Sequence, residues 1–106
     1  MKSMWKRAVL AMTLAAGVGS AGALEQFAGL VVVLEPTYLP ERITFTLSEG
    51  LPLCPAGKWL VWTHSSKENV MAVYNTLLAA KTSSRRIHIY IKDGDPTCTP
   101  QFLQMT

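Results

Sequence analysis

The chain has 106 residues, a formal net charge of +3 and 49% hydrophobic residues, a length that fits one domain. All of the positive excess lies in the first 23 residues, because residues 24–106 contain seven basic and seven acidic side chains. This balance argues against nucleic acid as a partner, since nucleic-acid-binding domains carry a clustered basic excess.

Residues 1–23 have the three parts of a secretory signal peptide. A basic start is followed by an apolar run over residues 8–18 and by an A-x-A cleavage site at residues 21–23. The apolar run is shorter than the roughly 18 residues that a membrane span requires. We therefore predict a secreted or periplasmic protein without a membrane span, whose mature part, residues 24–106, is a single domain.

The first half of this domain reads as strands. Phe27–Leu34 is rich in valine and leucine, and Arg42–Ser48 alternates apolar with polar residues. Lys58–His64 also alternates, with Trp59 and Trp62 on opposite faces. The sequence predicts three strands here, joined by loops that contain proline.

One amphipathic helix follows, with apolar residues at intervals of three and four up to about Lys81. Ser65 and Glu68 fit a capping box, which predicts that Ser65 caps the helix. The apolar face is predicted to consist of Val70, Val73, Tyr74, Leu77 and Leu78.

Two further strands complete the domain. Arg86–Lys92 places its isoleucines on one face and His88 and Tyr90 on the other. A turn at residues 93–96 separates it from a last strand over Thr97–Met105.

The order β-β-β-α-β-β predicts a mainly β protein. Five strands with a helix between the third and the fourth are typical of the OB-fold, a small, partly open barrel. An open α+β sheet with the helix on one face would use the same elements. We favour the barrel because the first and third strands carry apolar residues on both faces.

Cys54 and Cys98 are the only cysteines. In an exported chain they predict a disulfide bond that closes a long loop. Free or metal-binding thiols are the alternative, although neither a C-x-x-C spacing nor a histidine cluster accompanies them.

The sequence contains no recognisable catalytic arrangement, so we expect a protein that is not an enzyme and that has no metal or cofactor. Neither histidine has a nucleophile or carboxylate at a catalytic spacing. Aromatic residues remain as candidates for ligand contact. The candidate ligand-binding residues are Tyr38, Trp59, Trp62, His88 and Tyr90.

The second half of the chain resembles a family of small secreted bacterial proteins related to the B subunit of subtilase cytotoxin, and more distantly the binding subunits of pertussis-like and typhoid toxins. The resemblance is carried by Cys54, Trp59, Trp62, Ser65, Ser66, Asn69, Ala72, Tyr74, Leu77, Leu78, Ala79, Ala80, Ile87, Ile89, Tyr90 and Cys98. It implies an OB-fold, a ring of five subunits and binding of sialylated glycans on host cells. No sugar-binding residue of the toxins aligns with this chain.

Two functions are therefore expected from the sequence. The first is a secreted glycan-binding module, which forms an oligomer if the resemblance extends that far. The second is a periplasmic or secreted protein that presents an edge strand or an aromatic face to another protein. Catalysis and binding of single-stranded nucleic acid rank behind both.

Overall fold

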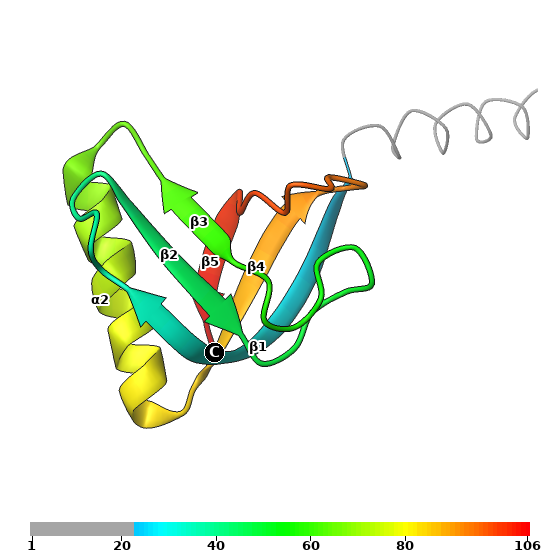
Figure 1. The fold of residues 1–106 in the computed structure, drawn as a ribbon, viewed down its shortest axis with the longest axis horizontal. Coiled ribbons are helices and arrows are strands. Elements are labelled where there is room, and N and C mark those ends of the chain that lie inside the picture. Colours follow the sequence, from blue (N-terminus) through cyan, green and yellow to red (C-terminus); the bar gives the residue numbers. More distant parts are fainter. Residues whose placement is uncertain (1–22) are drawn as a thin grey trace, which may run out of the picture.

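A computed structural model describes residues 23–106, so the predicted signal peptide lies, apart from its last residue, outside the described residues. Five strands and one helix follow each other in the predicted order (Figure 1). They are β1 (Leu24–Glu35), β2 (Arg42–Leu47), β3 (Leu60–Thr63), α2 (Lys67–Ser83), β4 (Arg86–Lys92) and β5 (Phe102–Met105).

The strands form one antiparallel sheet with the order β3-β2-β1-β4-β5. The mainly β class and the β-β-β-α-β-β order are thus confirmed. The order is compatible with an OB-like barrel, but the barrel is not closed, because β3 and β5 do not pair with each other in residues 23–106. The sheet curls around the long β1, and α2 packs along one side of it (Figure 1).

β1 changes partner along its length. Residues 24–30 pair with β4, whereas Val31 and the residues after it pair with β2. The register shifts between Val31 and Val33, and the backbone N–H of Val33 donates to the Thr46 hydroxyl at 3.2 Å. Such an irregularity bends a strand and increases its twist, which lets one strand serve both halves of the sheet.

Gly29 lies just before this bend and is buried. A Cβ atom at this position would lie 2.9 Å from the backbone nitrogen of Glu49 and 3.3 Å from both Leu47 and Ser48. The end of β2 can therefore approach β1 closely because residue 29 has no side chain.

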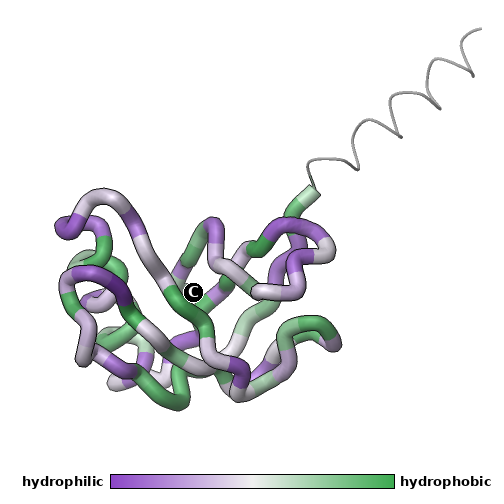
Figure 2. Tube along the Cα trace, turned by 45° about the horizontal axis from the view of Figure 1, so that its top comes forward, coloured by the Kyte–Doolittle hydropathy of each residue, from purple (hydrophilic) through white to green (hydrophobic). Residues whose placement is uncertain are grey.

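The core lies between the inner face of the sheet and α2. The most deeply buried side chains include Ile43, Phe45, Leu47, Val70, Leu77, Ile87, Ile89 and Ile91. Hydrophobic segments run through the strands (Figure 2), and the connection between β2 and β3 also contains the hydrophobic residues Leu51 and Leu53. Alternation in β2 and β4 places their apolar residues inward, as predicted.

Two details of the helix prediction are wrong. The N-cap is Ser66, not Ser65, because the Ser66 hydroxyl accepts a hydrogen bond from the N–H of Asn69 at 3.2 Å. Leu78 is 40% exposed, and Ala80 is buried in the core instead. The helix ends at Ser83, and Ser84 takes the left-handed conformation that terminates it.

β1 extends beyond the predicted Phe27–Leu34 at both ends, whereas β3 and β5 are shorter than predicted. Both have four residues, fewer than the predicted Lys58–His64 and Thr97–Met105. Residues 95–98 form a turn in which the N–H of Cys98 donates to the carbonyl of Asp95, so this stretch cannot extend β5. The predicted disulfide is present between Cys54 and Cys98, both 1% exposed.

We predict that Gly29→Ala destabilises the protein by about 1–3 kcal/mol, because the new methyl group meets backbone atoms that must shift. Urea unfolding measures the change, and Gln26→Ala, an exposed position on the same strand, is the control. Equal stabilities of the two variants would contradict the close approach.

Replacing both cysteines with serine should lower the free energy of unfolding by about 4 kcal/mol, because cysteines separated by 44 residues close a long loop in the unfolded chain. Circular dichroism during urea unfolding tests this expectation. Reduced wild-type protein should behave like the double variant. A urea midpoint that does not change in either sample would show that the bond contributes no stability.

Candidate binding pocket between strands 3 and 5

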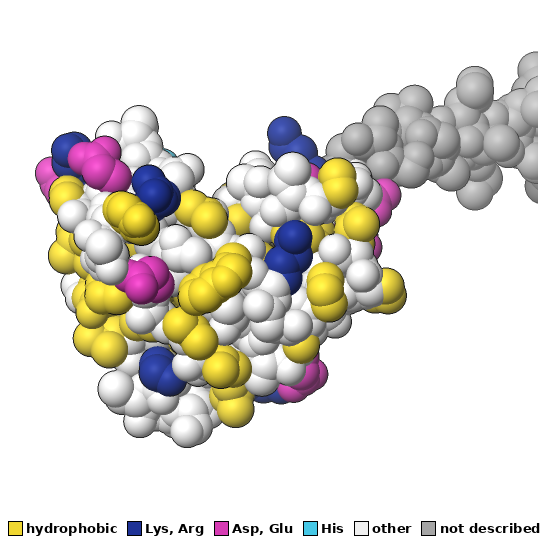
Figure 3. Space-filling model, in the orientation of Figure 1, with side chains coloured by type: hydrophobic (Ala, Val, Ile, Leu, Met, Phe, Trp, Pro, Cys, Tyr) yellow, Lys and Arg dark blue, Asp and Glu magenta, His cyan; other side chains and the backbone are white. Residues whose placement is uncertain are grey.

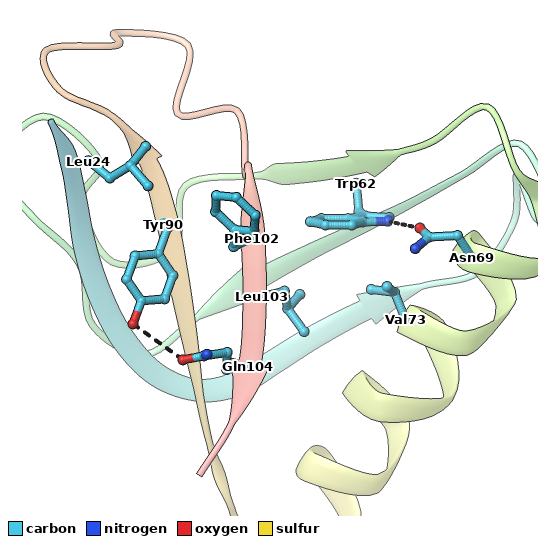
Figure 4. A pocket seen from close by; sticks show the side chains of 8 residues that line it. All are labelled: Leu24, Trp62, Asn69, Val73, Tyr90, Phe102, Leu103 and Gln104. Carbon is cyan, nitrogen blue, oxygen red and sulfur yellow. Dashed lines mark hydrogen bonds between the residues drawn. The ribbon is translucent and has the colours of Figure 1, made fainter. Parts of the chain in front are cut away.

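A pocket of about 490 Å³ lies where the barrel fails to close. We call the gap between β3 and β5, together with this pocket, the seam. Figure 3, in the orientation of Figure 1, shows the surface notched between these two strands. The residues that line the pocket are Leu24, Trp62, Asn69, Val73, Tyr90, Phe102, Leu103 and Gln104 (Figure 4).

Trp62 and Asn69 form one side of the seam. The indole Nε1–H of Trp62 donates to Oδ1 of Asn69 at 2.9 Å, and only 8% of Trp62 is exposed. Asn69 is held in turn by the helix cap, because its backbone N–H donates to Ser66. Its side-chain NH₂ group is the part of the amide that remains to donate to a ligand.

Tyr90, Phe102 and Gln104 form the other side. The rings of Tyr90 and Phe102 meet edge to face, with centroids 6.4 Å apart and planes at 83°. The Tyr90 hydroxyl donates to Oε1 of Gln104 at 3.3 Å, which leaves the NH₂ group of Gln104 for a ligand. Phe102 is 58% exposed and therefore offers the most accessible ring in the pocket.

β5 is anchored at its start by two features of the preceding turn. The first is the disulfide at Cys98, and the second is Asp95. The Asp95 carboxylate accepts hydrogen bonds from the Thr97 hydroxyl at 2.6 Å, from the Thr97 N–H at 2.8 Å and from the Thr99 N–H at 3.0 Å. These bonds, above all the one from the Thr97 hydroxyl, hold the pKa of Asp95 below its ordinary value.

The pocket lining contains no charged side chain among the described residues. Its polar groups are two amides, one phenol and one indole N–H, and the rest is aliphatic or aromatic. A charged ligand group would lose water in this pocket without gaining an opposite charge. The lining therefore matches an uncharged ligand.

The structure brings together only some of the residues predicted for ligand contact. Trp62 and Tyr90 face the same pocket. Trp59 is 53% exposed outside it, and Tyr38, 50% exposed, lies with its ring 3.9 Å from the guanidinium of Arg42. His88 is half-buried on β4, in a pair with Gln104 of β5.

Several lining residues were not among the sequence candidates. Phe102, Leu103 and Gln104 lie in the predicted last strand, and their alternation gave the only signal. Nothing in the sequence indicated that Asn69 lines a pocket, because a polar residue in the first turn of a helix is ordinary. Leu24 and Val73 complete the pocket through the pairing of β1 with β4 and through the packing of α2.

Within residues 23–106, no group of three or more histidine, cysteine, aspartate or glutamate side chains is arranged to hold a metal ion. In the same residues, no helix has both the length and the apolar character needed to cross a membrane.

No family model, curated protein or solved structure matches this chain. The resemblance to toxin binding subunits therefore stays a prediction.

We predict that Asp95→Asn destabilises the protein at neutral pH and has progressively less effect in acid. Because the folded-state pKa of Asp95 is lowered, its contribution is complete above the unfolded pKa of about 3.9 and is lost as the pH falls through the folded value. Urea unfolding of both proteins as a function of pH measures the difference. A gap that is the same at neutral pH and in acid would contradict this role of the carboxylate.

Proposed function

We propose that this chain is a secreted, non-enzymatic binding module that holds an uncharged ligand in the seam. The observation that carries the proposal is the pocket itself, which combines exposed ring surface with side-chain amides and excludes charge. Pockets of roughly 300–1,000 Å³ with an apolar lining and a few polar groups are usual for ligand binding. The lining groups can bind and orient a ligand, and the described lining contains no serine, cysteine, histidine or carboxylate.

The first candidate ligand is a glycan. The C–H face of a sugar ring packs on an aromatic ring, and the free NH₂ groups of Asn69 and Gln104 can donate to its hydroxyl groups. The toxin resemblance implies sialylated glycans. The uncharged lining favours neutral sugars instead, because a sialic acid carboxylate would find no cation among the described lining residues.

The second candidate is a segment of another protein. Two observations favour it: the exposed backbone edges of β3 and β5 border the seam, and Phe102 and Met105 are 58% and 42% exposed on β5. Binding at a free sheet edge is a common mode of peptide recognition. Both candidates use the same pocket, so one set of variants tests the site for both.

We expect Phe102→Ala to weaken ligand binding at least about tenfold, which corresponds to about 1.4 kcal/mol, because it removes the most exposed ring of the pocket. Trp59→Ala is the matched control, since Trp59 is exposed to a similar extent, 53%, but lies outside the pocket. Ligands come from an array of neutral and sialylated glycans and from pull-down with envelope extract. The bound species are then compared among wild-type and variant proteins.

Loss of binding in the Trp59 variant with normal binding in the Phe102 variant would move the site away from the seam. A protein that captures nothing in either assay would count against a binding function. Sedimentation of the same samples reports the oligomeric state that the toxin resemblance implies.

A further inference from the structure

We infer that the seam accepts one extended, uncharged segment of another protein, which pairs with β5 as an added strand. The inference rests on the proposed function and names its ligand class. Four observations support it independently of the toxin resemblance. They are the free backbone groups of β5, the absence of charge and proline in both edge strands, a lining that alternates between two faces, and a described lining without charged side chains.

The free side of β5 carries backbone groups that a strand can use. The N–H of Thr106 donates to the carbonyl of Arg86 at 3.0 Å, which fixes the phase of the β4–β5 ladder. Hydrogen-bonded positions alternate along an antiparallel pair. The amide and carbonyl groups of Leu103 and Met105 therefore point away from β4, toward the free edge.

Neither edge strand contains a charged residue or a proline, two of the features that normally prevent strand addition. Free edges are usually protected by charged side chains, proline or bulges. The sequences of β3 and β5 are LVWT and FLQM, which contain no charged residue and no proline. These two edges border the same pocket, so a single strand between them would cover both.

The lining follows both faces of β5, as a strand requires. Phe102 and Gln104 lie with Tyr90 on one face, whereas Leu103 lies on the other face, opposite buried Ile89 (Figure 4). Side chains of an added strand alternate in the same way. Its residues would meet the Tyr90–Phe102 rings on one side and the Trp62 side of the pocket on the other.

The chemistry of the segment follows from the lining. Because the described lining residues carry no charge, a lysine or glutamate in the segment would lose hydration without a partner. β5 has four residues, three of which line the pocket, so the contact extends over about four residues of the segment. Uncharged β-formers such as valine and threonine satisfy both conditions.

The strands of a second copy, within residues 23–106, do not meet the geometric requirement. A strand between β3 and β5 needs both of its own edges free. β1, β2 and β4 are paired on both sides, and β3 and β5 are each paired on one. No strand of the described residues 23–106 therefore has both edges free, and we take the segment to be an extended stretch of another protein.

Hydrogen exchange tests this inference on protein exported from the full-length chain. The probe is a hexapeptide of alternating threonine and valine with blocked ends. At saturation, we expect the amides of Leu103 and Met105 to exchange at least about tenfold more slowly, because they become hydrogen-bonded to the peptide. The same peptide with a central N-methylvaline lacks one donor, and one with a central lysine adds a charge. Both should bind at least about tenfold more weakly.

Two substitutions at one exposed position give a matched protein control. Met105→Pro removes an N–H on the free edge, where proline does not interrupt the β4 ladder. We expect it to weaken hexapeptide binding about tenfold, whereas Met105→Ala keeps the N–H and should bind nearly as well as wild type. Unchanged far-ultraviolet circular dichroism confirms that both variants fold.

The alternative results are distinct. Hexapeptide binding without protection of the two amides overturns the added strand. A second result also overturns the added strand: maltotriose binds and shifts the side-chain amide resonances of Asn69 and Gln104, whereas the hexapeptide has no effect. This result would still support the proposed function. If the two amides are protected without peptide and the protein sediments as a dimer, the segment in the seam belongs to a second copy of this chain. Failure of both probes and of the glycan array overturns the proposed function as well.

Discussion

The pairing of β1 with two different partners is the constraint on which the rest of the structure depends. Within the described residues, β2 and β3 join the sheet on one side of β1, and β4 and β5 join it on the other. The bulge at residues 31–33 and the missing side chain of Gly29 let β1 bend between these partners. Because the sheet curls around β1, its two outer strands face each other across the seam.

α2 connects the stability of the fold with the shape of the seam. Its buried face fills the space inside the curled sheet with Val70 and Leu77. Its first turn has a second task, because Asn69 is held by the Ser66 cap and itself holds the indole of Trp62. The cap that starts the helix therefore also orients an aromatic side chain of the pocket.

The sequence predicted the elements well because the elements are local. Period-two patterns identified β2 and β4, and apolar spacing identified α2, since these signals follow from backbone geometry. The helix cap was placed one residue too early, because Ser65 and Ser66 are both competent caps and their backbone conformations distinguish them. Leu78 was misplaced for a related reason, since only the tilt of α2 on the sheet decides whether Leu78 or Ala80 is buried.

The pocket was less predictable because it depends on strands that do not pair. A pattern of apolar residues indicates a strand, but it does not say where its free edge lies. Trp62 and Tyr90 were recognised as aromatic candidates, whereas Phe102 and Gln104 gained their meaning only once β5 was shown to be a short edge strand. The length of β5 is set by the turn around Asp95, whose side-chain hydrogen bonds act over a few residues and leave no periodic signal.

The Cys54–Cys98 disulfide determines when the pocket in the seam takes its final shape. It joins the loop after β2 to the turn before β5, so it ties together the two halves of the sheet that border the seam. In a reducing compartment the two thiols would remain unbonded, so no covalent link would join the loop after β2 to the turn before β5. Oxidation after the predicted export would then fix the walls at their final spacing. If the chain is exported as we predict and binds its ligand in the seam as we propose, it acquires the finished site only after it leaves the cytosol.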